Sequence, residues 1–448
     1  MITLGIDIGT THTKVLALSV ERGRSLALEA APTPTRQDAD GDTHRPAAVL
    51  ETVIELARSV VSSLDNADEV AAICAASVGE EVVLLDAQHR PIGDTIAWYD
   101  PRGLEEAASF SSGAGDRVAL SERWPPDPTF SIFKLMWIRD HWPAQYRAAT
   151  TWTDLGDYVL AGLGAEPVMD WSHASRAGAF DLTRHAWDPE TIGAAGLDIG
   201  FPRLVASGST IGTVDPGIAE RIGLSSEVAI VVGGHDHLCG AYGAGVRTTA
   251  ELFLSAGTSE AHLALVDAPI QHRGQRYRID QGCYVDADTY YVHVNIHSGH
   301  FFKQWRELLY ADVDEDAMYA EVAAAPADSG GATFALLDDL RLGRLDRVPY
   351  GVGRDVLMRA ILDGLADHSA EIIAELERAC GSPFELVLAA GHPTRIGLWN
   401  ELRNAAYGRP MAIVEEPETA AFGAAVIAAR AVGGHFVEDI VSRRTLLN

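Results

Sequence analysis

Short apolar runs separated by polar turns open the chain, and this pattern predicts strands. Gly9-Thr-Thr-His12 lies between the first two runs and is typical of a tight turn between paired strands. Apolar positions from Leu50 to Leu64 recur at helical spacing and predict one amphipathic helix. The predicted strands of this region cover residues 3–8, 13–18, 24–30 and 70–77. The opening order is therefore β-β-β-α-β.

The middle of the chain has a less regular pattern. Residues 108–116 are small and rich in Gly and Ser, which predicts a loop. The prolines at positions 125, 126 and 128 mark a turn. Residues 228–234 form a short apolar run that ends in glycine, which is typical of a buried strand.

The second half repeats the pattern of the first. Residues 251–265 read apolar, Gly-Thr-Ser, apolar, as residues 4–18 do around Gly-Thr-Thr. Further strands are predicted at residues 277–286, 289–296, 385–390 and 410–415, and helices at 357–376, 394–407 and 418–432. This alternation predicts an α/β fold, with a mostly parallel sheet covered by helices. We place the boundary between two domains, 1–246 and 247–448, within the segment 245–250.

Length, composition and charge narrow the range of functions. A chain of 448 residues is long enough for two domains of roughly 100–200 residues each. The content of 47% apolar and 22% charged residues is ordinary for a folded protein. A net charge of −28 disfavours nucleic acids and anionic membranes as partners.

The sequence carries no pattern of export or membrane insertion. No apolar run approaches the roughly 18 residues of a spanning helix, and the N-terminus has no basic lead. The cysteines, at positions 74, 239, 283 and 380, are scattered without a CxxC pair, which disfavours disulfides and structural zinc. We therefore expect a cytoplasmic protein.

The two Gly-Thr turns are the first candidates for chemistry. Asp7 lies in an apolar strand just before the first turn, where a buried carboxylate is costly unless a cation or hydrogen bonds compensate. The N–H groups and hydroxyls of such a turn can bind phosphate, and a carboxylate beside them suits Mg²⁺. A plain hairpin with a polar turn is the alternative for this segment alone. The second turn, at residues 255–259, favours a nucleotide held between two similar lobes.

Further segments, in order along the chain, resemble one protein family. They are GIDIGTTHTK at 5–14, LLD at 84–86, IAWYDPR at 96–102, KLMW at 134–137, DWSHASR at 170–176, GGHD at 233–236, SAGTS at 255–259, AAG at 389–391, LW at 398–399 and ETAAFGAA at 418–425. Together they are similar to the motifs of the FGGY family of carbohydrate kinases. The resemblance implies two ribonuclease-H-like (actin-like ATPase) domains, each a mixed sheet flanked by helices, with a cleft between them. It also implies transfer of the γ-phosphate of ATP to a primary hydroxyl of a small ketose or polyol, with a pentulose favoured.

The resemblance also implies roles for individual residues. Asp236 would be the base that takes the proton of the acceptor hydroxyl, and Asp7 and Asp236 would hold Mg²⁺. The substrate side would comprise Glu80, Trp98, Asp100, His235 and Asp236. The ATP side would comprise Gly9, Thr10, Thr11, Thr13, Lys14, Gly257, Thr258, Ser259, Ala390 and Gly391. The expected partner is a small sugar or polyol, and a homodimer is left open.

The acceptor side departs from well-known members of the family. Glu80 stands where pentulose kinases have a His and glycerol kinases a Glu, and it could accept hydrogen bonds from sugar hydroxyls. Gly79 and Thr129 replace an Arg and a Tyr of glycerol kinases, which argues against glycerol. On the nucleotide side, Ala390 replaces the first of two usual glycines, and residues 341–354 are contracted.

Three alternatives remain open from the sequence. His235, Asp236 and His237 could form a transition-metal site, with His293, His297 and His300 as further ligands. The fold could serve a non-catalytic or regulatory protein that binds sugar or nucleotide without turnover. It could also serve an actin- or chaperone-type ATPase that acts on a protein partner.

Overall fold

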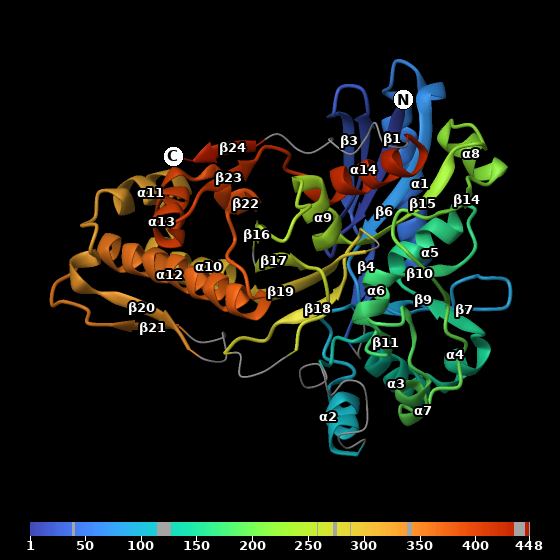
Figure 1. Cartoon of the computed structure of the whole chain (residues 1–448), viewed down its shortest axis with the longest axis horizontal. Helices are drawn as coiled ribbons and strands as arrows, with labels where there is room; N and C mark the ends of the chain where they lie inside the picture. The colour runs from blue at the N-terminus through green and yellow to red at the C-terminus, as the bar shows by residue number, and fades with distance from the viewer. Residues whose placement is uncertain are drawn as a thin grey trace.

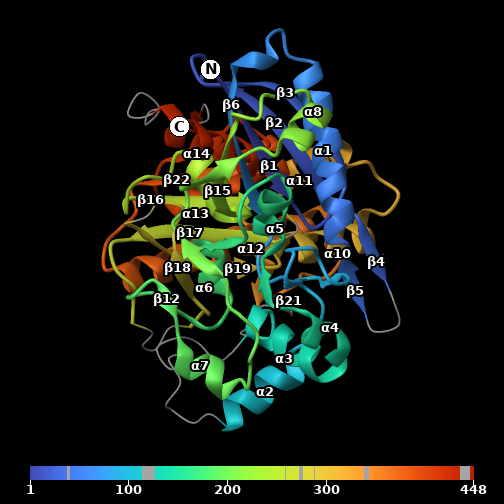
Figure 2. The same cartoon turned by 90° about the vertical axis from the view of Figure 1, so that its right-hand side faces the viewer.

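The chain folds into two lobes, each built around one mixed sheet (Figures 1 and 2). The computed structural model describes residues 1–37, 41–113, 127–257, 259–271, 276–286, 288–337, 343–433 and 444–447. Thr258, one of the expected ATP-binding residues, therefore lies outside the described residues. Within these ranges, no helix combines the length and the apolar character that a membrane crossing requires.

The first lobe contains the following strands and helices. The strands are β1 Ile2–Ile8, β2 His12–Ser19, β3 Arg24–Pro32, β4 Thr35–Gln37, β5 Asp42–His44, β6 Val70–Ser77, β7 Val83–Leu85, β8 Thr95–Ile96, β9 Thr151–Thr153, β10 Val168–Asp170, β11 Phe180–Asp181, β12 Ala186–Trp187, β13 Arg203–Val205, β14 Thr210–Thr213 and β15 Ala229–His235. The helices are α1 Pro46–Ser62, α2 Leu104–Gly113, α3 Ser131–His141, α4 Pro143–Ala148, α5 Leu155–Gly162, α6 Trp171–Arg176, α7 Pro189–Ala194, α8 Pro216–Ile222 and α9 Asp236–Ala244, with a 3-10 turn η1 Ala67–Glu69.

The second lobe has its own set of elements. The strands are β16 Glu251–Ala256, β17 Glu260–Val266, β18 Asp280–Cys283, β19 Tyr290–Ile296, β20 Thr333–Leu336, β21 Gly343–Asp346, β22 Leu386–Ala390, β23 Met411–Val414 and β24 Arg444–Leu447. The helices are α10 Ser298–Tyr310, α11 Glu315–Ala323, α12 Arg354–Cys380, α13 Gly397–Tyr407 and α14 Thr419–Gly433, with 3-10 turns η4 Ser329–Gly331 and η5 His392–Arg395.

The two central sheets share one topology. In the first lobe the order is β14-β15-β6-β1-β2-β3, with β1 antiparallel to β2 and parallel to β6. In the second lobe it is β18-β19-β17-β16-β22-β23-β24, with β16 antiparallel to β17 and parallel to β22. Each sheet contains an antiparallel hairpin, parallel strands and an antiparallel edge strand, β14 or β24, so both sheets are mixed. The mostly parallel sheet expected from the alternation of strands and helices is therefore wrong, whereas the mixed sheets implied by the family resemblance are confirmed. The repeat predicted from the two Gly-Thr segments is confirmed as a structural repeat.

The alternation along β1 separates a core face from a cleft face. Ile2, Leu4, Ile6 and Ile8 belong to the apolar core that α1 covers. Because side chains of a strand alternate, Thr3, Gly5 and Asp7 lie together on the other face. The Thr3 hydroxyl donates to the Ala425 carbonyl of α14. This second face of β1 therefore packs against a helix near the C-terminus of the chain.

Helix α14 joins the two lobes through very close backbone contacts. A Cβ on Gly5 would lie 1.9 Å from the Ala421 carbonyl oxygen, and one on Gly423 would lie 1.8 Å from the Cys239 carbonyl oxygen. These glycines let α14 pack directly against β1 and α9 (Figure 1). A continuous apolar cluster surrounds the contact, with Leu16 from the first sheet and Phe253 from the second. The relative position of the lobes is set largely at this crossing.

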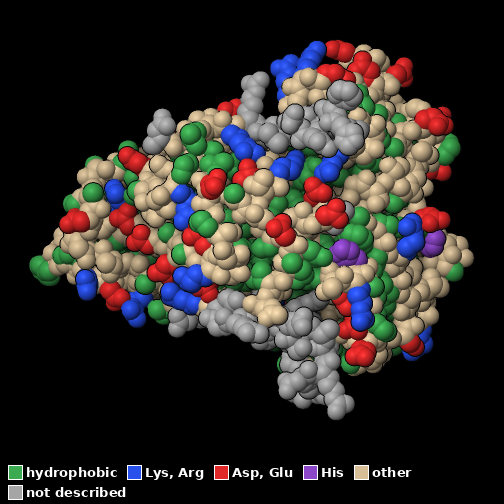
Figure 3. All heavy atoms as spheres, in the orientation of Figure 1, with side chains coloured by type: hydrophobic (Ala, Val, Ile, Leu, Met, Phe, Trp, Pro, Cys, Tyr) green, Lys and Arg blue, Asp and Glu red, His purple; other side chains and the backbone are tan. Residues whose placement is uncertain are grey.

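Charges of both signs are distributed over the surface. Figure 3 shows acidic and basic side chains interspersed over one face that includes both lobes. Several exposed pairs join them, including Arg276 with Glu371 at 2.9 Å and Arg354 with Glu321 at 2.8 Å. Exposed pairs of this kind contribute only about 0–1 kcal/mol each, so the stability of the fold lies mainly in its cores.

Most predicted elements are confirmed, with small shifts at their ends. The expected strand at 277–286 is shorter, as β18, and the helix expected from 394 is divided into η5 and α13. The loop predicted at 108–116 is wrong for residues 108–113, because α2 continues to Gly113. Helix α2 packs against α3, and Phe110 contacts Phe133 with ring centroids 5.6 Å apart, so tertiary packing overrides the weak local signal.

The helix crossing gives a direct test by substitution. Gly423→Ala would force its Cβ into the Cys239 carbonyl, and overpacking of this kind costs about 1–3 kcal/mol of unfolding free energy. Gly397→Ala is the matched control, because no atom lies within 4 Å of its added Cβ. Urea unfolding followed by circular dichroism should show a lower midpoint for Gly423→Ala alone. Equal midpoints for the two variants would contradict the proposed role of the crossing.

Candidate active site

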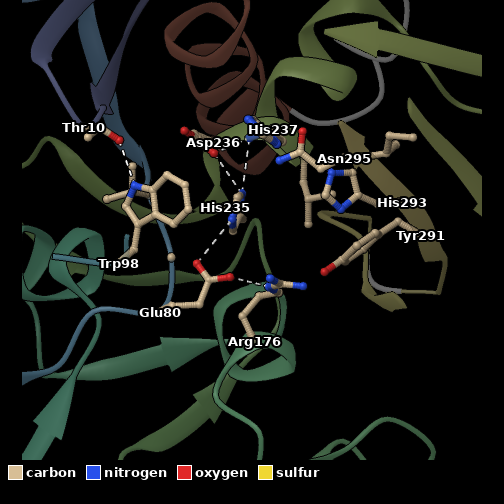
Figure 4. Close-up of a pocket in the computed structure, with 14 residues that line it drawn as sticks. Thr10, Glu80, Trp98, Arg176, His235, Asp236, His237, Tyr291, His293 and Asn295 are labelled. Carbon is tan, nitrogen blue, oxygen red and sulfur yellow. Dashed lines mark hydrogen bonds and ion pairs between the residues drawn. The ribbon is translucent and has the colours of Figure 1, made fainter. Parts of the chain in front are cut away.

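A cavity of about 130 Å³ lies between the two lobes. The first lobe contributes Thr10, Val78, Gly79, Glu80, Trp98, Arg176, His235, Asp236, His237 and Leu238, and the second contributes Leu263, Tyr291, His293 and Asn295. Figure 4 shows polar side chains from both lobes facing one another across this space. The cavity therefore combines acids, histidines, an arginine and aromatic rings from distant parts of the sequence.

Asp236 lies where β15 ends and α9 begins. Its Oδ1 accepts the His237 backbone N–H at 2.6 Å and lies 2.9 Å from His235 Nδ1. Burial alone would raise the pKa of Asp236, but His237, His235 and these hydrogen bonds hold that pKa well below its usual range. The helix N-terminus also favours the anion. Asp236 is therefore an ionised carboxylate that faces the cavity.

The pKa of Asp7, near the end of β1, is shifted in the opposite direction from that of Asp236. Burial raises the pKa of Asp7 to about 7, and the charge of Asp236 adds to the shift. Lys14 Nζ lies 3.8 Å from Asp7 Oδ2 and also pairs with Glu418 of the second lobe. The carboxylates of Asp7 and Asp236 thus influence each other, and Lys14 compensates their charge only in part.

A buried ionic cluster lies behind Asp236 and supports its turn. The carboxylate of Asp170 accepts hydrogen bonds from the Ser172 hydroxyl, at 2.5 Å, and from His173 Nδ1. Although burial opposes it, the charges of Asp154 and Asp170 raise the pKa of His173 well above its usual value. The Ser172 hydroxyl in turn accepts the backbone N–H of His235 at 2.9 Å. This network fixes the backbone immediately before Asp236.

Glu80 has an unusual backbone conformation in the loop after β6. Its φ of 64° is in the left-handed region, which costs a residue with a side chain of order 1 kcal/mol. Arg176 Nε holds one carboxylate oxygen of Glu80 at 2.5 Å, and His235 Nε2 lies 3.9 Å from the other. Arg176 Nη1 also lies 3.2 Å from Asp280 Oδ2 on β18. Arg176 is thus shared between an acid of each lobe.

Trp98 and the first Gly-Thr turn are tied together. The indole Nε1 of Trp98 donates to the Thr10 hydroxyl at 2.9 Å, and the Trp98 backbone N–H donates to Glu81 at 3.2 Å. His44 bridges the same elements, because its Nδ1 lies 2.7 Å from Glu81 and its Nε2 lies 3.3 Å from the Thr10 carbonyl oxygen. Lys134 Nζ donates to the Trp98 carbonyl at 3.1 Å. The first Gly-Thr turn is therefore anchored to Trp98, which lines the cavity.

A second cavity, of about 430 Å³, lies in the second lobe beside the second Gly-Thr turn. Gly257 lines it together with Trp399, Tyr319 and Phe302, which supply aromatic surface. The buried pair of Glu260 and Arg403 forms part of its wall. A slot of this size, apolar with a few polar groups, suits a flat heterocycle such as a nucleotide base.

Gly391 lies at the turn that follows β22. Its φ is 110°, and a Cβ would lie 1.9 Å from the Ala256 carbonyl oxygen, so a glycine is required there. Gly391 and Glu418 line a third cavity. Ala390 is buried at the end of β22, directly beside Ser255 of the second hairpin. The two turns of the second lobe thus approach each other closely.

The structure brings together part of the predicted set. Thr10, Glu80, Trp98, His235 and Asp236 line the cleft cavity. Gly9 and Gly257 close their turns by donating to the carbonyls of His12 and Ser259, each at 3.0 Å. Thr11 is exposed at its turn, and the Ser259 hydroxyl lies 3.4 Å from His297 Nδ1.

Asp100 and Thr13 are among the predicted residues that do not line this cavity, and both have local partners. Asp100 was expected to contact substrate, but its carboxylate is bound by Arg102, with Nε at 2.6 Å, and by the Asp42 backbone N–H at 2.6 Å. Thr13 was expected on the ATP side, but it is fully buried, and its hydroxyl lies 3.1 Å from that of Thr33. Local partners satisfy both side chains in this structure, and their expected roles in binding stay predictions.

The transition-metal alternative has a simpler structural account. One ligand-type atom from each of His235, Asp236 and His237 lies within 4.8 Å of the others. The Nδ1 of His235, however, is already within hydrogen-bond distance of Asp236, at 2.9 Å. His300, on α10, interacts instead with Gln304 at 3.0 Å. The geometry describes a hydrogen-bonded acid and histidine pair at the cavity.

Several cavity residues were not assigned to the site from the sequence. Arg176 ends the family-like segment 170–176, His237 follows Asp236, and Tyr291, His293 and Asn295 come from β19. Of these, His237 and His293 were named from the sequence only as candidate metal ligands. The spacing of two between the β19 residues along a predicted strand indicated a shared face. The sequence could not indicate that this face meets the other lobe.

Comparisons with known proteins agree with the architecture. Residues 2–243 match the N-terminal domain of the FGGY family of carbohydrate kinases, and residues 252–432 match its C-terminal domain. The chain is 23% identical to the xylulose kinase of Bacillus subtilis (strain 168) over 440 residues, covering 95% of this chain and 87% of the relative. It is 22% identical to the gluconokinase of the same strain over 464 residues, covering 98% and 89%.

A solved structure shares the whole fold. The xylulose kinase from Rhodospirillum rubrum has a TM-score of 0.91 at 21% identity, covering 99% of this chain and 93% of the other. The repeated sheets are therefore those of the actin-like ATPase fold, as the sequence predicted. The sugars named for the relatives differ, whereas the kinase chemistry is common to them. The chain belongs to the FGGY family of carbohydrate kinases, which transfer a phosphoryl group to an alcohol.

Proposed function

We propose that the chain transfers the γ-phosphoryl group of ATP to a primary hydroxyl of a neutral ketose or polyol of pentulose size. The main support is the shared cavity in which the ionised Asp236 faces Glu80 and the first Gly-Thr turn. Relatives named as xylulose kinases favour a pentulose. Residues 1–246 would then bind the acceptor and carry the catalytic base Asp236. Residues 247–448 would bind most of the adenosine.

On the ATP side, we propose that the two Gly-Thr turns bind phosphate. The backbone of Gly9, Thr10 and Thr11 and that of Gly257, Thr258 and Ser259 would donate N–H groups to phosphate oxygens. The 430 Å³ cavity beside Gly257 would hold the adenine ring of ATP. The turn at Ala390 and Gly391 would border the ribose and phosphates. Lys14 would add positive charge near Asp7.

The residues in the cleft fit Mg²⁺. Asp7 and Asp236 are hard oxygen ligands, and their mutual repulsion contributes to the raised pKa of Asp7. A divalent cation between them would relieve that repulsion, which Lys14 compensates only in part. When bound with ATP, Mg²⁺ would neutralise charge on the phosphates.

Asp236 would act directly on the acceptor. Its carboxylate would accept the hydrogen bond of the reacting hydroxyl, orient the oxygen toward the γ-phosphorus, and take the proton as the new bond forms. His235 would hold the carboxylate in place through the 2.9 Å contact. Glu80, fixed by Arg176, would accept hydrogen bonds from other hydroxyls. Closing of the lobes would exclude water, which competes as an acceptor.

Removal of the proposed base gives the first functional test. Asp236→Asn should lower kcat by about 10²–10⁴-fold, while the KM for the acceptor changes little, because the loss falls on proton transfer. Coupled detection of ADP with a panel of ketoses and polyols measures both constants. Asp267→Asn, at an exposed carboxylate, is the control.

The panel also separates the proposal from its alternatives. If wild-type protein shows no sugar-dependent turnover, a non-catalytic binding protein is favoured. ATP turnover that needs no sugar and survives Glu80→Ala would indicate an ATPase acting on a protein. Full activity of Asp236→Asn would exclude the role of this residue as the base.

The charges of the cavity favour a neutral acceptor over a sugar acid. Arg176 is the only Lys or Arg among the described cavity-lining residues, and it is already shared by Glu80 and Asp280. Burial lowers the pKa of His237, and it lowers that of His293 to about 3, so neither offers a fixed positive charge. A substrate carboxylate would meet Glu80 and Asp236 without a free counter-charge.

A matched pair of acceptors tests this charge argument. The kcat/KM for D-xylulose should exceed that for D-xylonate, which has the same number of carbons, by at least about tenfold, or ~1.4 kcal/mol. Glu80→Gln should reduce the ratio, because it removes one negative charge and releases Arg176 toward the substrate. Equal or better use of D-xylonate by the wild type would contradict a neutral acceptor.

A further inference from the structure

The second lobe supplies a polar wall to the acceptor cavity. Tyr291, His293 and Asn295 occupy alternate positions on β19, and all three line the cavity. Val292 and Val294, at the intervening positions, are buried in the core of the second lobe. Figure 4 shows the three polar side chains across the cavity from Trp98 and Thr10. The wall is thus a regular strand face supported by an apolar core.

One ring nitrogen of His293, on this wall, lacks a hydrogen-bond partner among the described residues. This nitrogen, Nε2, is buried. The ring lies against His237 in a T-shaped contact, with centroids 6.0 Å apart. Leaving a buried polar nitrogen unpaired is unfavourable, so a partner supplied by a ligand would be favoured.

The protonation state of His293 suits a hydroxyl partner. Burial, together with the nearby His237, lowers the pKa of His293 to about 3, so the ring is neutral at neutral pH. A neutral imidazole offers one N–H donor and one acceptor nitrogen. A sugar hydroxyl, which both donates and accepts, pairs with either nitrogen, whereas a carboxylate pairs only with the donor.

We propose that His293 is a specificity-determining residue that binds a hydroxyl of the acceptor other than the one phosphorylated. The acceptor would then be recognised by Glu80 and Asp236 from the first lobe and by His293 from the second. This inference rests on the proposed function and adds to it a hydroxyl-binding residue on the opposite lobe.

The position of β19 links this contact to the nucleotide side. Strand β19 pairs along its length with β17, which begins directly after the second Gly-Thr turn. Arg176 makes a second bridge of the same kind, because it joins Glu80 to Asp280 on β18. A contact between the acceptor and His293 therefore favours the arrangement in which the lobes are close together. Acceptor and nucleotide should strengthen each other's binding, as reciprocal linkage requires.

The test begins with the wild type on a ketose panel that contains D-xylulose and L-ribulose. The acceptor with the highest kcat/KM is then used with His293→Ala, His293→Asn and, as a control, His141→Ala on the exposed end of α3. We expect His293→Ala to raise the KM for the acceptor at least tenfold, with kcat changed less than threefold. The Kd for ATP, measured without acceptor, and the melting temperature should stay unchanged. His293→Asn, which keeps a donor and an acceptor, should recover part of the loss.

Monodeoxy analogues of the acceptor identify the hydroxyl. For one analogue, the loss of affinity in the wild type should equal the loss that His293→Ala shows with the full acceptor. His293→Ala tested with that same analogue should show little further loss. Additive losses for every analogue, or an unchanged KM in His293→Ala, would overturn the inference while leaving the kinase activity in place. Absence of turnover by the wild type with every acceptor would instead overturn the proposed function, and the inference with it.

Discussion

Two carboxylates in a shared cleft impose the main constraint on this structure. Asp7 is the next-to-last residue of β1, and Asp236 directly follows β15. Strand β6 lies between β1 and β15 in the sheet. The charges of the two carboxylates act on each other strongly enough to contribute to the raised pKa of Asp7. Such an arrangement persists only where the surrounding fold fixes it and a ligand can compensate the charge. The buried Asp170 cluster and the crossing of α14 supply that rigidity.

The acceptor side uses charge in a different way. Arg176, the only arginine among the described lining residues, pairs with both Glu80 and Asp280. Its positive charge therefore orients the Glu80 side chain and is not free to bind an acidic substrate. The strained backbone of Glu80 fits this view, because the arginine holds its side chain in one position. Under the proposed function, selectivity among sugars would depend on hydrogen bonds from both lobes. Those contacts exist together only when the lobes are close.

The sequence predicts the frame of this protein well and the details of its site less completely. The two hairpins, with Gly9 and Gly257 at their turns, follow from apolar periodicity and turn residues alone. Asp236 could be identified because it follows an apolar strand and two glycines. Asp100 and Thr13 have local partners, Arg102 and Thr33, which the sequence pattern did not predict, and their expected roles stay predictions. His293 could be named from the sequence only as a strand residue and a candidate metal ligand, because its place in the same cavity as Glu80 requires the packing of two lobes.

A crystal structure with the best acceptor of the panel and a non-hydrolysable ATP analogue tests the central claim most directly. The account predicts that a primary hydroxyl lies within about 3 Å of an Asp236 oxygen and points toward the γ-phosphorus, while the triphosphate contacts both Gly-Thr turns. An acceptor bound away from Asp236, or a triphosphate held by neither turn, would contradict it.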